Sequence, residues 1–227
     1  ANTDDGSCSH SSPLAGLYLE MIYNGSSNFT NGEKTYRLYA ELDTNGSILT
    51  QIFGDETRPH AISTTTTFWN GDVFGTPANL QSEVNTGAWV LFPENEYDTW
   101  VSLGDSYTSA PSTVGDVGLG TDLSGSSWSF GGTINSDASI FRVATDPLCI
   151  PDTNGRVLLG QFTTSGVLSG VINLAGIGPD GISPWVENQI TIPAVTCPQE
   201  GDANCDGIVN LADLTLVINN WLQSTTI

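Results

Sequence analysis

The segment KTYRLYAEL, residues 34–42, constrains the fold more than any other part of the sequence, because its side chains alternate between apolar and polar. A period of two residues is typical of a β-strand with one face in the core and the other in solvent. The predicted core face carries Tyr36, Leu38, Ala40 and Leu42, and the predicted solvent face carries Arg37, Tyr39 and Glu41. The pair Asn45–Gly46 follows and favours a tight hairpin turn into a second strand at residues 47–54.

Short strand candidates separated by turn residues continue along most of the chain. A second hairpin is predicted to turn at Ser165–Gly166, and no convincing helix precedes residue 208. Residues 104–138 lack regular alternation and are predicted to form a loop with short strands near Trp128 and Phe130. We therefore expect a mainly β protein, an antiparallel β-sandwich or jelly roll with a short C-terminal calcium loop and helix. The other strand candidates are residues 16–23, 61–69, 87–92, 98–103, 138–144, 156–163, 166–174 and 188–195.

The charge balance restricts the partners of the chain. It has 25 acidic and 5 basic residues among 227, which gives a formal net charge of -20 at pH 7. A field of this sign repels nucleic acids and anionic membrane surfaces, so we expect neither as a partner, whereas it attracts divalent cations. The sequence also lacks an apolar run of about 18 residues, so we expect no membrane insertion.

The acidic loop that begins at Asp202 is the strongest functional signal. Counted from Asp202, oxygen ligands recur at the spacing of an EF-hand calcium loop, and Gly207 stands at the sixth position, where such a loop turns sharply. Carboxylates held this close repel one another, so a bound dication makes the cluster stabilising. The pattern favours a Ca²⁺ site over a solvated acidic turn that caps a helix. The predicted ligands are Asp202, Asn204, Asp206, the backbone carbonyl of Ile208, Asn210 and Asp213.

A short amphipathic helix is predicted to follow this loop. Apolar residues recur at helical spacing between Leu211 and Trp221 and form one stripe. A helix this short is only marginally stable alone, so the stripe needs a surface to pack on. That surface is either the sandwich of the same chain or a partner.

The segment GDANCDGIVNLADLTLVINNW, residues 201–221, resembles one type I dockerin repeat. This calcium loop with its helix occurs in cellulosomal proteins and in secreted proteins of planctomycetes and other marine bacteria. The resemblance implies Ca²⁺ as the bound ion. Dockerins that bind cohesin carry two such repeats, whereas this chain has one, so a structural calcium clip is implied in place of cohesin binding. The residues that match the ligand positions are Asp202, Asn204, Asp206, Ile208 and Asp213.

The four cysteines favour disulfides over a zinc site, because they form no C-x-x-C pair and the chain has two histidines. Cys197 and Cys205 suit a local bridge at the start of the acidic loop, which leaves Cys8 to pair with Cys149, although the other pairings stay open. Disulfides indicate an oxidising compartment outside the cytoplasm. The chain begins without a signal peptide, so we expect a mature form or part of a longer protein.

We expect three parts: an N-terminal tail at residues 1–12, a β-sandwich domain at 13–196, and the dockerin-like calcium-binding loop and helix at 197–227. The predicted protein is secreted and lies at the cell surface. Its predicted role is that of a calcium-stabilised structural module of a surface layer, fibre or adhesin, with self-assembly into a polymer.

Two other classes of function are weighed against this role. An enzyme is not expected, because His10 and His60 stand in no nucleophile motif, and Glu94 and Glu96 are better explained as surface charge. The alternative is a carbohydrate-binding module of a secreted polysaccharide-handling system. It requires tryptophans exposed for stacking on glycan rings, with Trp185 as the first candidate.

Overall fold

The computed structural model describes residues 12–23, 29–43, 46–73, 76–77, 80–104, 115–117, 127–130, 137–195, 201, 209–211, 213–215 and 217–218. The chain divides into two compact units, Ala1–Pro193 and Ala194–Ile227. The first unit is mainly β, with antiparallel sheets that curl into a half-barrel, and this confirms the predicted fold class. In the described part of the chain, no helix combines the length and the apolar character needed to cross a bilayer.

The first sheet has four strands and is built around the segment that opens the sequence argument. Its order is β1-β2-β11-β7, with bounds β1 (Leu14–Tyr23), β2 (Lys34–Leu42), β11 (Arg156–Thr164) and β7 (Trp100–Val101). The alternation predicted for residues 34–42 is confirmed: Tyr36, Leu38, Ala40 and Leu42 are buried, whereas Arg37, Tyr39 and Glu41 are half-buried on the opposite face.

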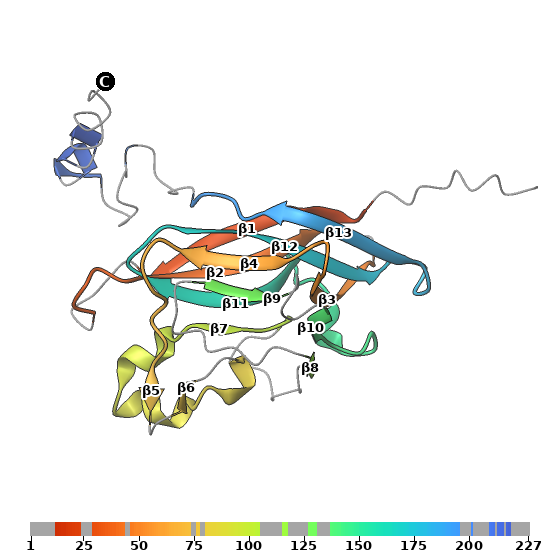
Figure 1. Ribbon diagram of the computed structural model, residues 1–227, viewed down its shortest axis with the longest axis horizontal. Helices are drawn as coiled ribbons and strands as arrows, with labels where there is room; N and C mark the ends of the chain where they lie inside the picture. The colour runs from red at the N-terminus through yellow and green to blue at the C-terminus, as the bar shows by residue number, and fades with distance from the viewer. Residues whose placement is uncertain are drawn as a thin grey trace, which may run out of the picture. The chain divides into compact units, whose positions relative to one another are not determined.

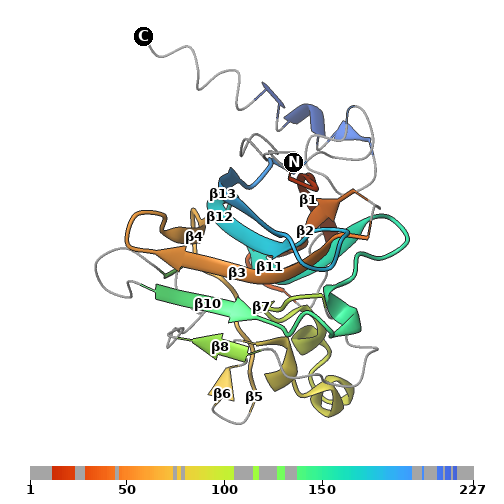
Figure 2. The ribbon, with the colours of Figure 1, turned by 90° about the vertical axis from the view of Figure 1, so that its right-hand side faces the viewer.

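The second sheet has seven strands in the order β8-β10-β3-β12-β4-β9, with β13 paired to the other side of β12. Strands β3 and β4 follow one another along one edge of β12. Figures 1 and 2 show β1 and β13, the end strands of the two sheets, side by side, and this approach curls the unit. The bounds are β3 (Ile48–Asp55), β4 (His60–Thr64), β8 (Gly115–Val117), β9 (Ser127–Phe130), β10 (Asp137–Phe141), β12 (Leu168–Ile177) and β13 (Pro184–Thr191).

Both predicted hairpins are wrong, although the strands that they join are present. β2 and β3 lie in different sheets, and so do β11 and β12. The turn after Leu42 and the turn at Ser165–Gly166 therefore carry the chain from one sheet to the other. The reason is that β2 already has β1 and β11 on its two edges, so β3 finds its partners in β10 and β12.

The strand predicted at residues 87–92 is also wrong, because this region folds into 3₁₀-helices. The Asn85 side chain accepts a hydrogen bond from the Gly87 amide at 3.1 Å and caps the helix η2 (Thr86–Val90). Pro93 then opens the helix η3 (Pro93–Tyr97). The remaining small elements are β5 (Asp72–Val73), β6 (Thr76–Pro77), η1 (Gln81–Glu83) and η4 (Pro147–Cys149).

The core of the first unit lies between the two sheets. Leu38 of β2, Phe162 of β11, Ile140 of β10 and Leu174 of β12 are all fully buried. Trimming such a side chain to alanine typically costs about 2–5 kcal/mol, because the cavity left behind refills only in part. This packed interior gives the outer face of the first sheet a fixed geometry.

Candidate functional site

Most of the predicted calcium loop lies outside the described residues. Asp202, Asn204, Asp206 and Ile208 belong to that part, and the described residues contain no group of three or more His, Cys, Asp or Glu placed to hold a metal ion. The structure describes the last two predicted ligands, Asn210 and Asp213. An Oδ atom of Asp213 accepts a hydrogen bond from the Asn210 amide at 2.7 Å, and Asp213 is 3% exposed. The carboxylate at the predicted twelfth loop position is thus buried and turned towards the Asn210 amide.

Helical residues follow Asn210 in the range 211–218, as predicted. Within this C-terminal unit the described apolar residues of the stripe are largely exposed. Leu211 is 74% exposed, Leu214 52% and Val217 54%. In the part of this stripe that the structure describes, the apolar side chains are therefore left largely uncovered.

The predicted Cys8–Cys149 disulfide is not formed, because Cys149 carries a free thiol. Cys149 is the buried last residue of η4, and its sulfur lies 3.5 Å from the Val143 carbonyl oxygen. Burial raises the pKa of the Cys149 thiol to about 11, so it stays protonated and unreactive at neutral pH. The other three cysteines, Cys8, Cys197 and Cys205, lie outside the described residues.

The tryptophans do not form the exposed row that the carbohydrate-binding alternative requires. Trp185, its first candidate, is 6% exposed, and its indole nitrogen donates a hydrogen bond to the Ile48 carbonyl at 3.2 Å. Trp100 and Trp128 are buried as well, and Trp69 and Trp89 are half-buried. The remaining tryptophan, Trp221, lies outside the described residues. The sequence predicts that most of these rings belong to the core, but the exposure it predicts for Trp185 is wrong.

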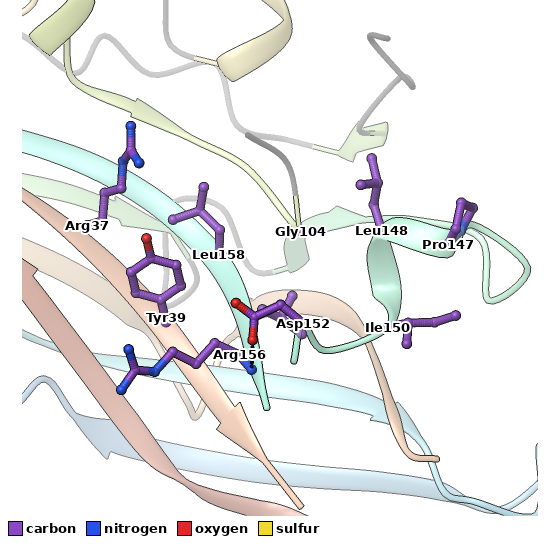
Figure 3. Close-up of a pocket in the computed structure, with 10 residues that line it drawn as sticks. Arg37, Tyr39, Gly104, Pro147, Leu148, Ile150, Asp152, Arg156 and Leu158 are labelled. Carbon is purple, nitrogen blue, oxygen red and sulfur yellow. Dashed lines mark hydrogen bonds between the residues drawn. The ribbon is translucent and has the colours of Figure 1, made fainter. Parts of the chain in front are cut away.

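A pocket of about 280 Å³ opens on the outer face of the first sheet. Figure 3 shows Arg37, Tyr39 and Arg156 on one side of it and Pro147, Leu148 and Ile150 on the other. The first group comes from β2 and β11, the second from η4 and the residue after it. The sequence predicts a solvent face for Arg37 and Tyr39 but does not reveal the pocket, because β2 and η4 are about a hundred residues apart in the chain.

The polar side of the pocket is fixed by cross-strand contacts. Arg156 donates a hydrogen bond from Nε to Glu41 at 2.9 Å, and its guanidinium lies 3.5 Å from the centre of the Tyr18 ring. Tyr39 donates its hydroxyl hydrogen to Glu20 at 3.1 Å. Burial and the neighbouring Glu20 raise the pKa of Tyr39, so the hydroxyl stays protonated at neutral pH.

The apolar side of the pocket is anchored from behind by a buried arginine. Arg142 donates from Nε to the Leu103 carbonyl and from a terminal nitrogen to Asp146 at 3.0 Å. Asp146 in turn accepts a hydrogen bond from the Leu148 amide at 2.9 Å and caps η4. Gly104 has a φ of +72°, and a Cβ atom there would lie 1.7 Å from the Leu148 carbonyl oxygen. Hydrogen bonds and close packing therefore hold the apolar side of the pocket in place.

Two buried titratable groups lie away from this pocket. Asp98 accepts hydrogen bonds on one carboxylate oxygen from the amides of Gly71 at 2.6 Å and Thr99 at 2.8 Å. Burial outweighs these bonds and raises the pKa of Asp98 to about 7. His60 is fully buried with its ring edge-on to Trp128 at 4.7 Å, and burial lowers its pKa to about 3. We assign these groups to folding, since both are enclosed.

Comparison with protein-family models, curated protein sequences and solved structures finds no significant match to this chain. The function proposed below is therefore argued from the chain itself.

Proposed function

We propose that the chain is a non-catalytic, extracellular structural module whose C-terminal loop binds Ca²⁺ in the manner of a type I dockerin repeat. The observation that carries this proposal is the position of Asp213. A buried carboxylate is costly unless it is paired or coordinates a cation. The sequence places Asp213 at the twelfth position, after acidic and amide oxygens in the order of a calcium loop, and the Asn210 amide donates a hydrogen bond to it at 2.7 Å.

The exposed apolar residues support a role in assembly. Leu211, Leu214 and Val217 present an apolar stripe that its own unit leaves uncovered. The first unit adds a second apolar surface at the junction of η2 and η3, where Val90 is 87% exposed and Leu91 73%. Consecutive exposed apolar side chains of this kind are typical of contact sites with other molecules. We propose a neighbouring copy of the chain as the occupant, as in a fibre or surface layer.

The way the first unit uses its polar side chains also favours a structural role. Thr35 and Thr163 hydrogen-bond each other at 2.7 Å across β2 and β11. Thr64 and Thr164 do the same at 2.6 Å between the two sheets. These hydroxyls hold strands together, and so they are not available as nucleophiles. Each cross-strand threonine pair stabilises a sheet by about 0.2–1 kcal/mol.

The experiment is to examine the whole chain by light scattering and negative-stain electron microscopy, with calcium and with a chelator. We expect calcium-dependent oligomers or polymers, and we expect Leu214→Asp to reduce assembly strongly because it places a charge in the apolar stripe. Ile182→Asp is the matched control, since Ile182 is an exposed apolar residue on the turn between β12 and β13. Monomers in calcium, or normal assembly of Leu214→Asp, would contradict the proposal.

A further inference from the structure

Arg37 differs from the other arginines in its partners. Arg58 pairs with Asp55, Arg142 with Asp146 and Arg156 with Glu41. Arg37 donates from Nε to the Gln161 side chain at 3.2 Å, and among the described residues no ion pair to it is formed. Gln161 is held in turn by the Glu96 and Asp98 carbonyls, so it fixes the Arg37 stem without neutralising its charge. Glu20 lies opposite Arg37 in the β1–β2 register and accepts the hydroxyl hydrogen of Tyr39, which is a close neighbour of Arg37. The Arg37 guanidinium has five N–H donors and lines the pocket, so it can still donate to a further acceptor there.

We propose that this pocket binds the ring of an acidic sugar, a uronic acid unit, with the sugar carboxylate on the terminal nitrogens of Arg37. A guanidinium takes a carboxylate through two parallel hydrogen bonds, which fixes orientation as well as charge. This site goes beyond the calcium-stabilised structural role and does not depend on it.

The charges around the pocket favour one carboxylate and exclude a polyanion. Two of the five basic residues of the chain, Arg37 and Arg156, line the pocket, and Glu41 already neutralises Arg156. Asp152, which also lines the pocket, and the net charge of -20 repel a strongly acidic peptide or a continuous polyuronate. The charge pattern therefore fits an isolated uronic acid within a neutral glycan.

The shape and lining of the pocket fit a sugar ring. Its volume of about 280 Å³ is close to the lower end of the range for small-molecule sites, about 300–1,000 Å³, so a single ring suits it better than a larger ligand. Leu148, Pro147 and Leu158 offer apolar surface to the C–H face of a ring. The Tyr39 hydroxyl and the Asp152 carboxylate stand beside it as partners for ring hydroxyls (Figure 3).

The pocket walls are fixed before a ligand arrives. Asp152 accepts hydrogen bonds from the amides of Asn154 at 2.8 Å and Arg156 at 2.9 Å, which holds the turn that leads into β11. The Gly104 amide donates to the Leu158 carbonyl at 2.7 Å and holds the segment that follows β7 against β11. A preformed site loses little conformational entropy on binding, which favours affinity for a small ligand.

The test is calorimetric titration of the whole chain, in calcium and in chelator, with methyl glucuronide, methyl glucoside and acetate. We expect saturable binding of the glucuronide with a Kd of roughly millimolar order, unchanged by the chelator, and at least about tenfold weaker binding of the other two probes. Independence from calcium separates a failure of this site from a failure of the proposed calcium function.

Arg37→Gln should weaken glucuronide binding by about 10- to 100-fold, because it removes a charge-assisted hydrogen-bonded pair. Arg58→Gln is the matched control and should leave the Kd unchanged, since Arg58 pairs with Asp55 away from the pocket. Ile150→Glu is a second variant at an exposed position on the pocket rim, where the new carboxylate should repel the ligand even if Arg37→Gln does not fold.

Three outcomes would overturn the proposal. Equal affinity for glucuronide and acetate would show an adventitious anion only. Equal affinity for glucuronide and glucoside would remove the role of Arg37 as carboxylate partner. Unchanged binding in both Arg37→Gln and Ile150→Glu, or no binding of glucuronide at all, would remove the pocket as the site.

Discussion

At the scale of single residues, the first unit buries two titratable groups, Asp98 and His60, whose contributions to stability change with pH in opposite directions. The pKa of Asp98 is raised to about 7 by burial, so the folded chain keeps a proton that the unfolded chain loses near pH 4. The pKa of His60 is lowered to about 3 by burial, so between about pH 3 and pH 6.5 the folded chain does not bind a proton that the unfolded chain binds. The contribution of Asp98 therefore falls as pH rises, and that of His60 falls as pH drops.

Asp98→Asn tests this linkage. The amide oxygen can keep both hydrogen bonds from Gly71 and Thr99, while the titratable proton is removed. Relative to the wild type, we expect the variant to gain stability between about pH 4 and about pH 7, by up to about 4 kcal/mol. Urea unfolding across this range measures it, with Asp43→Asn at an exposed position as the control. A constant difference between variant and wild type at every pH would contradict the raised pKa.

At the scale of elements, one buried amide holds a strand end, a loop and an edge bulge together. Asn173 of β12 is fully buried and donates to the carbonyls of Phe53 at 3.0 Å and Arg58 at 2.9 Å. Its oxygen accepts from the amide and the side chain of Gln189 at 2.8 and 3.1 Å. Gln189 has a φ of +54°, which is rare for a residue other than glycine, and stands where the β12–β13 register shifts. A bulge of this kind on an end strand discourages edge-to-edge pairing.

Asn173→Asp should lower the free energy of unfolding by at least about 2 kcal/mol, because the two carbonyls lose their donors and face a carboxylate. Asn188→Asp makes the same chemical change at an exposed position of β13, next to Arg58, and should be nearly neutral. Chemical unfolding of the two variants measures the contrast. Equal stabilities would show that the Asn173 network contributes little.

The elements also show what the sequence could and could not reveal. Alternation predicts β2 well, because one buried face leaves a local pattern, and strand-like composition predicts β3, β11 and β12. Partner strands leave no such pattern: the sequence predicts hairpins between β2 and β3 and between β11 and β12, whereas the two strands of each pair lie in different sheets. The aromatic and apolar run at residues 87–92 has strand-like composition. However, Asn85 caps the helix η2, which covers most of this run, and Pro93 begins the helix η3 directly after it.

The sequence predicts a candidate site better when the residues of that site lie close together along the chain. The predicted calcium loop spans twelve consecutive residues, so its spacing is readable from the sequence, and the structure describes Asn210 and Asp213 joined by a hydrogen bond. The pocket at Arg37 and Tyr39 needs η4 and the end of β7, which only the folded sheet brings there. Long-range packing of this kind also buries Trp185, which the sequence predicts to be exposed.

At the scale of the whole molecule, the chain combines a packed β unit with a small C-terminal unit of short helical structure. The first unit has a large core, whereas a helix of this length is marginal without a further source of stability. An ion bound only to the folded loop supplies such a source by mass action, worth about 2.7 kcal/mol at a free ion concentration a hundredfold above Kd. The C-terminal unit is therefore expected to depend on calcium more than the first unit does.

Calcium titration of the whole chain by calorimetry tests this account most directly, with Asp206→Ala as the variant and Asp180→Ala, on the turn between β12 and β13, as the matched acidic control. The account predicts one Ca²⁺ bound per chain in the wild type and in Asp180→Ala, with a Kd of about 10⁻⁴–10⁻³ M or lower, as in other extracellular modules. It predicts that Asp206→Ala loses this binding. A wild-type chain that binds no calcium at millimolar concentrations, or an Asp206→Ala chain that binds it as well as the wild type, would contradict it.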